Sequence, residues 1–146
     1  MAFPKDKQAW IDNFHQITRD TAVEALEIRL VDIDDNTIVL MMPIKDKHRQ
    51  PYGLLHGGVS MLLAETAASF HASWGVDFNQ VAPVGIEING SHLRSASEGH
   101  VRAVGLVLRR SRALIVHEIE IIHAESGKLL SIGRVTNYYK PQKPLE

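Results

Sequence analysis

The chain contains no cysteine. This absence excludes disulfide bonds, thiolate metal sites and a cysteine nucleophile, and it suits a reducing compartment. The sequence also lacks an uncharged apolar run long enough to span a membrane, and its first residues, MAFPKDKQAW, lack the apolar core of a signal peptide. We therefore expect a soluble, cytoplasmic protein that has no membrane partner.

A strong excess of charge is absent as well. The 16 Lys and Arg residues nearly balance the 17 Asp and Glu residues, for a net charge of −1. Such a balance excludes a general attraction to nucleic acid or anionic lipid, so any charge-driven binding must be local. No repeat, linker or low-complexity tract interrupts the 146 residues. We expect a single domain over residues 1–146.

The hydrophobic pattern predicts an α+β domain. Trp10, Phe14 and Ile17 recur at helical spacing, which predicts an amphipathic helix over residues 5–19. A β-hairpin is expected over 24–44, and a long apolar helix begins at Gly57. Four short strand segments follow at regular spacing, which favours an antiparallel meander; they cover residues 84–93, 100–109, 113–124 and 129–139.

The predicted elements amount to about six strands, one long central helix and an extra N-terminal helix. The sheet must wrap its apolar face around the central helix. One helix leaves sheet edges uncovered, so we expect a homo-oligomer rather than a monomer.

The stretch from Gln50 to Val76, QPYGLLHGGVSMLLAETAASFHASWGV, contains a single formal charge, that of Glu65. A carboxylate on a helix that is apolar nearly all round is expected to be buried. Because an unpaired buried carboxylate costs several kcal/mol, such a group is usually paired or used in chemistry. Glu65 is therefore a candidate catalytic residue, with a paired interface carboxylate as the structural alternative.

The turn before this helix carries hydrogen-bond donors. The first amides of a helix have no intrahelical acceptor, and Gly57 leaves them unshielded by a side chain. Gln50 and His56 add side-chain donors just upstream. Together these groups can hold a carbonyl oxygen or a developing oxyanion. The alternative is that the glycine pair only forms the turn and that His56 is structural.

Glu65 lies eight residues after Gly57, about 12 Å along a helix. That distance is too long for one chain's donors and carboxylate to meet at one carbonyl group, so we expect them to come from different subunits. Ser69 lies one turn beyond Glu65 on the same face and is placed to bind the carboxylate, a water or the substrate.

The stretch QPYGLLHGGVSMLLAETAAS resembles the signature of hotdog-fold acyl-CoA thioesterases, and GIEINGSHLRSASEGHVRAV resembles the same group. The similar branch contains the Arthrobacter-type 4-hydroxybenzoyl-CoA, phenylacetate-pathway, 1,4-dihydroxy-2-naphthoyl-CoA and enterobactin-proofreading thioesterases. The resemblance covers nearly the whole chain.

The resemblance implies a thioester hydrolase in which Glu65 is the nucleophile or general base. It implies that the Gly57 amide forms the oxyanion hole, that Gln50 and His56 orient the carbonyl group, and that Ser69 assists. It further implies that the donors and the carboxylate come from opposite subunits, in a dimer at minimum and a homotetramer built as a dimer of dimers.

A concentration of arginine suggests where coenzyme A binds. Five arginines lie between positions 94 and 112, against the single acid Glu98. Guanidinium groups suit the pyrophosphate and ribose phosphate of CoA, although some of these arginines are expected only to face solvent. By resemblance, the substrate-binding candidates are Asn89, His92, Ser111, Arg112, Arg94 and Met61. Scarce interleaved aromatics argue against a nucleic-acid surface.

No histidine spacing matches a metal site, and no cofactor is expected beyond the CoA of the substrate. We predict hydrolysis of an acyl-CoA, with an aromatic or medium-chain acyl group, to the free acid and CoA. Met61, Leu62, Phe70 and Trp74 are expected to line the acyl pocket. The alternatives are a non-catalytic acyl-CoA sensor on the same fold and a hotdog dehydratase, for which no Asp-His arrangement is found.

Overall fold

The computed structural model describes residues 5–143. The chain begins with helix α1 (Lys7–Ile17) and the short helix α2 (Ala22–Ala25). Asp6 caps α1 by accepting a hydrogen bond from the amide of Ala9 at 3.0 Å. Helix α1 buries Trp10 and Phe14 as their spacing predicts, and it is slightly shorter than expected.

Strands β1 (Arg29–Ile33) and β2 (Thr37–Pro43) form the expected antiparallel hairpin. The carboxylate of Asp34 fixes the turn because it accepts hydrogen bonds from the amides of Asn36 and Thr37. A 3₁₀ turn (Asp46–His48) then leads to the long helix α3 (Gly57–Ala72).

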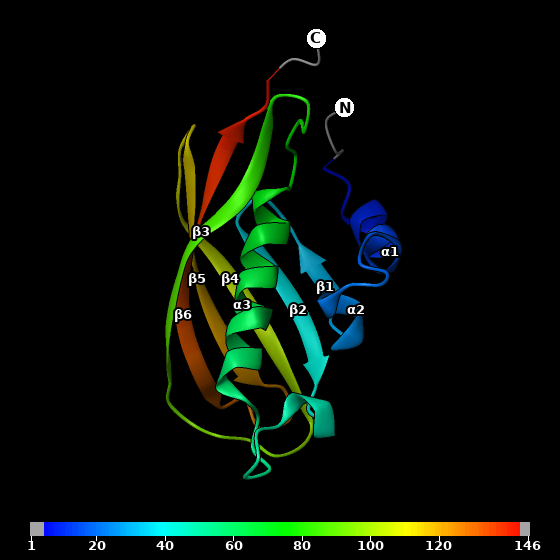
Figure 1. The fold of residues 1–146 in the computed structure, drawn as a ribbon, viewed down its shortest axis with the longest axis vertical. Helices are drawn as coiled ribbons and strands as arrows, with labels where there is room; N and C mark the ends of the chain where they lie inside the picture. The colour runs from blue at the N-terminus through cyan, green and yellow to red at the C-terminus, as the bar shows by residue number, and fades with distance from the viewer. Residues whose placement is uncertain (1–4, 144–146) are drawn as a thin grey trace.

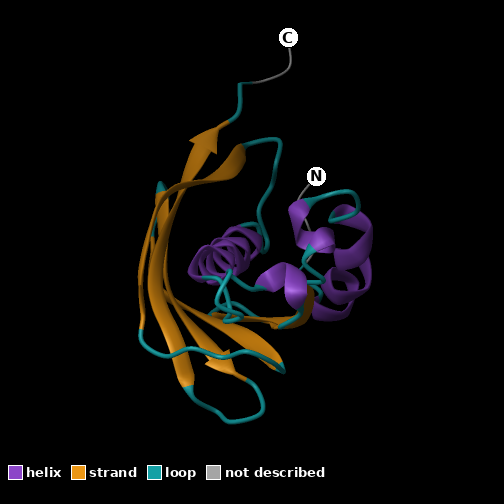
Figure 2. Cartoon of the chain, turned by 60° about the horizontal axis from the view of Figure 1, so that its bottom comes forward, coloured by secondary structure: helices purple, strands orange, loops and turns teal. Residues whose placement is uncertain are grey.

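Strands β3 (Val81–His92), β4 (His100–Arg110), β5 (Leu114–His123) and β6 (Leu129–Pro141) complete one antiparallel sheet. The sheet order is β1-β2-β4-β5-β6-β3. The sheet curves around α3, and α1 and α2 lie on the side of α3 that faces away from β3 (Figures 1 and 2).

The predicted four-strand meander is wrong for its first strand. Strands β4, β5 and β6 do follow one another, but β3 pairs with β6 at the far edge of the sheet, and β4 pairs with β2. Between His92 and His100 the chain therefore passes from the edge strand β3, across β6 and β5, to the interior strand β4. Strand spacing in the sequence does not encode this crossover, because the pairing of β3 with β6 depends on contacts between residues far apart in the sequence.

The core lies between α3 and the concave face of the sheet. Helix α3 buries one face, which includes Leu63, Ala64, Ala67 and Ala68, rather than its whole circumference. Two aromatic contacts attach α1 to the end of α3: Trp10 with Trp74 at 5.6 Å and Phe14 with Phe70 at 4.8 Å between ring centroids. Within residues 5–143, no helix is long and apolar enough to cross a membrane.

Candidate active site

At the first turn of α3, the side-chain acceptor of the capping residue is used in a hydrogen bond within the turn, which leaves a side-chain donor available. His56 is the N-cap of the helix, and its Nδ1 accepts a hydrogen bond from the amide of Gly58 at 2.8 Å. A neutral imidazole whose Nδ1 accepts carries its proton on Nε2. His56 therefore offers a donor to its surroundings while it caps the helix.

Gln50 likewise uses its side-chain acceptor within the turn and leaves its donor available. Its side-chain Oε1 accepts a hydrogen bond from the amide of Tyr52, which leaves the side-chain amino group as the donor. Backbone hydrogen bonds from Gln50 to Leu54 and from Gly53 to Gln50 hold this turn in place. The Gly57 amide donates to no group within the described part of the chain.

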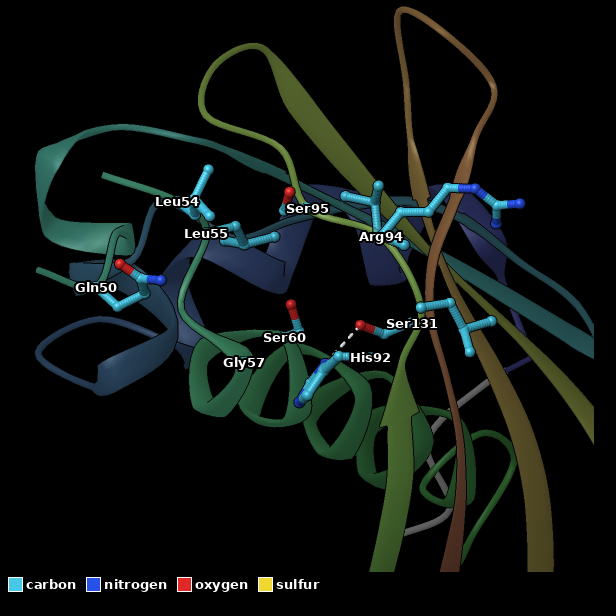
Figure 3. Close-up of a pocket in the computed structure, with 11 residues that line it drawn as sticks. Gln50, Leu54, Leu55, Gly57, Ser60, His92, Arg94, Ser95 and Ser131 are labelled. Carbon is cyan, nitrogen blue, oxygen red and sulfur yellow. Dashed lines mark hydrogen bonds between the residues drawn. The ribbon is translucent and has the colours of Figure 1, made fainter. Parts of the chain in front are cut away.

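A cavity of about 420 Å³ adjoins this turn. Figure 3 shows Gln50, Gly57 and His92 around it, with the imidazole of His92 beside the start of α3. Ser131 holds that ring through a hydrogen bond between its hydroxyl and Nδ1 at 2.7 Å. A methyl group built on Gly57 would lie 2.5 Å from Nε2 of His92. Glycine is therefore required at position 57 for the ring to approach the helix.

Glu65 lies two turns further along α3 and is exposed in the single chain, contrary to the expectation of burial. Its carboxylate faces β3, where a methyl group built on Gly85 would lie 2.9 Å from Oε1. The helix face that carries Glu65 is open because, within residues 5–143, no strand lies beyond β3. Ser69 is half-buried one turn on and accepts a hydrogen bond from Asn137 of β6 at 3.2 Å.

Met61 lies between the donor turn and Glu65. Its sulfur would be 2.7 Å from a methyl group built on Gly90, which pairs with Gly133 across β3 and β6. The absence of a side chain at Gly90 thus makes room for the thioether of Met61. Phe70 and Trp74, predicted to line the acyl pocket with Met61, instead contact the aromatic rings of α1.

The predicted CoA-binding residues do not lie together in one chain. Arg94 lines the first cavity, but its guanidinium extends away from α3 (Figure 3) and donates to the carbonyl of Leu129. Asn89 donates to Glu87 at 2.8 Å and lies on the sheet face opposite α3. Ser111 and Arg112 line a second cavity of about 320 Å³ with Trp74, just past the other end of α3.

Two histidines form a buried pair between α3 and β5. His71 Nδ1 lies 2.7 Å from His117 Nε2, and His71 Nε2 donates to the backbone oxygen of Asp34. A carbonyl oxygen only accepts, so the neutral His71 accepts at Nδ1 and His117 donates. Burial lowers the pKa of both rings, and the neighbouring His71 helps to lower the pKa of His117 to about 3. The pair is neutral at pH 7.

Comparison with known proteins shows the family to which this chain belongs. The model of the thioesterase superfamily matches residues 52–130. The chain belongs to the thioesterase superfamily. The match starts just after Gln50 and contains Gly57, Glu65 and Ser69. The sequence prediction of a thioester hydrolase is thereby confirmed at the level of the family.

Relatives within the superfamily are similar over most of their length. The chain is 41% identical to 1,4-dihydroxy-2-naphthoyl-CoA hydrolase of Escherichia coli over 76% of this chain and 80% of that protein. The crystal structure of a glutamine-to-alanine variant of thioesterase PA1618 from Pseudomonas aeruginosa is 32% identical, has a TM-score of 0.86, and covers 90% of this chain and 94% of that one. The predicted hotdog fold is confirmed.

The Staphylococcus aureus thioesterase SAV0944 is also similar, at 34% identity and a TM-score of 0.79 over 82% of this chain and 98% of that chain. Its structure is known for one variant with a glutamate replaced by alanine and for another with a glutamine replaced. Those two positions are separated by the same number of residues as Gln50 and Glu65 here.

Two residues of the candidate site were not predicted from the sequence. Asn137 and Ser131 lie on β6 and hold Ser69 and His92. Both are buried polar residues on the same face of β6. Only the pairing of β6 with β3 brings them to the site. Within residues 5–143, no cluster of acidic or histidine side chains could hold a metal ion.

Proposed function

We propose that this chain hydrolyses an acyl-CoA, with an aromatic or medium-chain acyl group, to the free carboxylic acid and CoA. The observation that carries the proposal is that the turn before α3 has its side-chain acceptors engaged and its donors available. The acceptor atoms of Gln50 and His56 are engaged within the turn, and the Gly57 amide has no acceptor in the described chain. These donors suit the oxygen of a thioester carbonyl, on which negative charge develops during attack.

Glu65 supplies the attacking group in this proposal. It either adds to the carbonyl carbon itself, forming a mixed anhydride, or removes a proton from the water that adds. In the first case the carbon–sulfur bond breaks as the anhydride forms, and water then hydrolyses the anhydride to the free acid and restores Glu65. In the second case the oxygen of the water replaces the sulfur directly. In both cases CoA leaves as the thiolate, and the proton released by the water converts it to the thiol. The equal spacing of the two residues replaced in SAV0944 supports the choice of Gln50 and Glu65.

The site is proposed to form between two copies of the chain. Gly57 and Glu65 are about 12 Å apart along α3, too far for one carbonyl group. Within residues 5–143, strand β3 has a free edge, and Ile86 on this strand is 57% exposed. Pairing of two β3 edges would bring Glu65 of one chain toward the donor turn of the other. Further pairing of dimers would give the expected tetramer.

Replacement of Glu65 tests the reaction. Glu65→Gln and Glu65→Ala are expected to lower kcat about 10²- to 10⁴-fold, as for loss of a general base, with an unchanged circular dichroism spectrum. Glu98→Gln, which removes an exposed carboxylate in the loop after β3, is the matched control. Free thiol release from benzoyl-CoA and octanoyl-CoA measures turnover. Wild-type turnover in Glu65→Gln would contradict the mechanism, and tight acyl-CoA binding without thiol release by the wild type would favour a sensor.

A further inference from the structure

Asn137 occupies a position on β6 that faces α3. It pairs with Gly85 of β3 on one side and with Ile115 of β5 on the other, and its side chain is fully buried. Its amino group donates to the hydroxyl of Ser69 at 3.2 Å. Its Oδ1 atom is buried and has no hydrogen-bond partner within residues 5–143.

This arrangement costs stability. A buried amide oxygen without a donor has lost its hydrogen bonds to water without replacement, whereas an apolar residue of similar size would pack there without that cost. The neighbouring inward-facing residue of β6, Val135, is apolar and fully buried. An asparagine at position 137 is therefore better explained by its one contact, the hydroxyl of Ser69, than by packing.

The direction of that contact matters for the chemistry. Because Asn137 donates to Ser69, the hydroxyl uses its oxygen as an acceptor and keeps its own proton for another partner. Glu65 lies one helical turn before Ser69 on the same face. The hydroxyl proton is thus available on the side of the helix where the carboxylate acts.

Gly85 keeps the space beside these groups open. A methyl group built on Gly85 would lie 2.9 Å from Oε1 of Glu65 and 3.7 Å from the amino group of Asn137. The register of β3 against β6 shifts between Gly85 and Glu87, so a β-bulge lies at this point. Bulges commonly occur beside active sites, where they redirect side chains. The carboxylate and the amide therefore border one small space that holds no side chain of β3.

We propose that Asn137 is a positioning residue for thioester hydrolysis, acting through Ser69. Its amide fixes the Ser69 hydroxyl as a donor toward the water or the acyl oxygen beside Glu65. This inference rests on the proposed function, in which Glu65 attacks or activates the water. It adds a second residue of the last strand, besides Ser131, to the candidate site.

A double-mutant cycle tests the coupling. Asn137→Ala and Ser69→Ala are each expected to lower kcat about tenfold, the rate equivalent of one hydrogen bond, with KM within about twofold of wild type. The double variant is expected to be no slower than Ser69→Ala alone. Asn79→Ala, an exposed asparagine in the loop before β3, is the control and should match wild type. Equal losses from Asn137→Ala in the presence and absence of Ser69 would overturn the proposal, and so would an unchanged kcat.

The isosteric change Asn137→Asp provides a readout that packing alone would not affect. The titratable and charged groups that face position 137 are Glu65 and His71 from α3, His117 from β5, Arg110 from β4 and Tyr139 from β6 itself. A carboxylate beside Glu65 disfavours the ionised form of Glu65, so the acid limb of the kcat/KM profile should move to higher pH. An unmoved acid limb in an active, folded Asn137→Asp protein would contradict the placement.

The two proposals fail in different ways. If the proposed function is wrong, the wild type releases no thiol or Glu65→Gln retains full turnover, whatever the behaviour of position 137. If only the role of Asn137 is wrong, Glu65→Gln is inactive while Asn137→Ala has wild-type kcat or loses activity independently of Ser69.

Discussion

At the scale of single residues, the site depends on which atom of each side chain is already engaged. His56 and Gln50 both use a side-chain acceptor inside the turn, and their side-chain donors have no partner within residues 5–143. Residue type alone leaves this open, because histidine and glutamine each carry a donor and an acceptor. The sequence indicated which residues gather, and the hydrogen bonds show what they can offer.

The two tasks of His56, capping and donating, are separable by substitution. His56→Ala removes the acceptor for the Gly58 amide and should destabilise the protein by about 1 kcal/mol, a fall of roughly 2–4 °C in thermal midpoint. His56→Asn supplies another capping acceptor, so its midpoint should stay close to wild type. Both variants lose the imidazole donor, and both should lose about tenfold or more in kcat/KM. Thermal unfolding and thiol release measure the two effects, and full activity in folded His56→Ala, which has no side-chain donor, would contradict a donor role.

Arg112 is expected to bind phosphate. It is exposed beside the second cavity with Ser111, where a guanidinium can pair with a CoA phosphate. Arg112→Ala should raise KM for benzoyl-CoA about tenfold and leave KM for the benzoyl thioester of N-acetylcysteamine, which lacks the nucleotide, unchanged. Arg19→Ala, an exposed arginine between α1 and α2, is the control. An equal rise for both substrates would show that Arg112 does not contact the nucleotide.

At the scale of elements, the sequence predicted where the helices and strands lie along the chain better than which strands pair with one another. The expected hairpin, the long helix from Gly57 and the later strands all form, because apolar periodicity and turn residues act locally. The position of β3 at the far edge was not predictable, since pairing with β6 is decided by distant contacts. The same pairing brings Asn137 and Ser131 to the site, which explains why both were missed.

The contact between α3 and β5 gives the fold a dependence on pH. His71 and His117 have folded pKa values below the usual 6.5, with that of His117 at about 3. The unfolded chain therefore binds more protons than the folded chain between pH 6.5 and about 3, and stability falls as pH falls through this window. The loss amounts to about 1.4 kcal/mol per pH unit for each histidine that stays neutral.

Urea unfolding between pH 7 and pH 4 should show this dependence. The free energy of unfolding of the wild type should fall more steeply with acidification than that of the double variant His71→Leu, His117→Leu. The comparison of slopes matters, because the lowered pKa values of carboxylates such as Asp34 and Glu125 add acid sensitivity to both proteins. Parallel slopes would mean that the buried pair is not held neutral.

At the scale of the whole molecule, the proposed donors and the proposed carboxylate lie too far apart on one chain to act on one carbonyl group. The donor turn begins α3, Glu65 lies two turns later, and β3 leaves its edge unpaired within residues 5–143. If two chains pair along this edge, each site takes its donors from one chain and its carboxylate from the other.

Mixing inactive variants tests this sharing. Glu65→Ala and Gly57→Ala should each be inactive alone, the second because the added methyl group would lie 2.5 Å from the ring of His92. After unfolding and refolding as an equal mixture, half of the dimers should be mixed, and each mixed dimer should hold one intact site. About a quarter of wild-type activity is then expected. Tagged subunits and native mass spectrometry verify mixed dimers, and no activity in verified mixed dimers would count against shared sites.

Gly90, which lies against Met61, has a consequence for how this protein could diverge. A methyl group at position 90 would lie 2.7 Å from the flexible thioether of Met61 and 3.1 Å from the backbone oxygen of Ile132, while Glu65 lies beside Gly85 and the donor turn lies near His92. Methionine adapts to new surroundings at little cost. A single alanine at position 90 would therefore reshape the floor beneath α3 and leave the reactive groups in place. If the chain hydrolyses an acyl-CoA as proposed, mutation at position 90 would alter the range of acyl groups accepted without first abolishing hydrolysis.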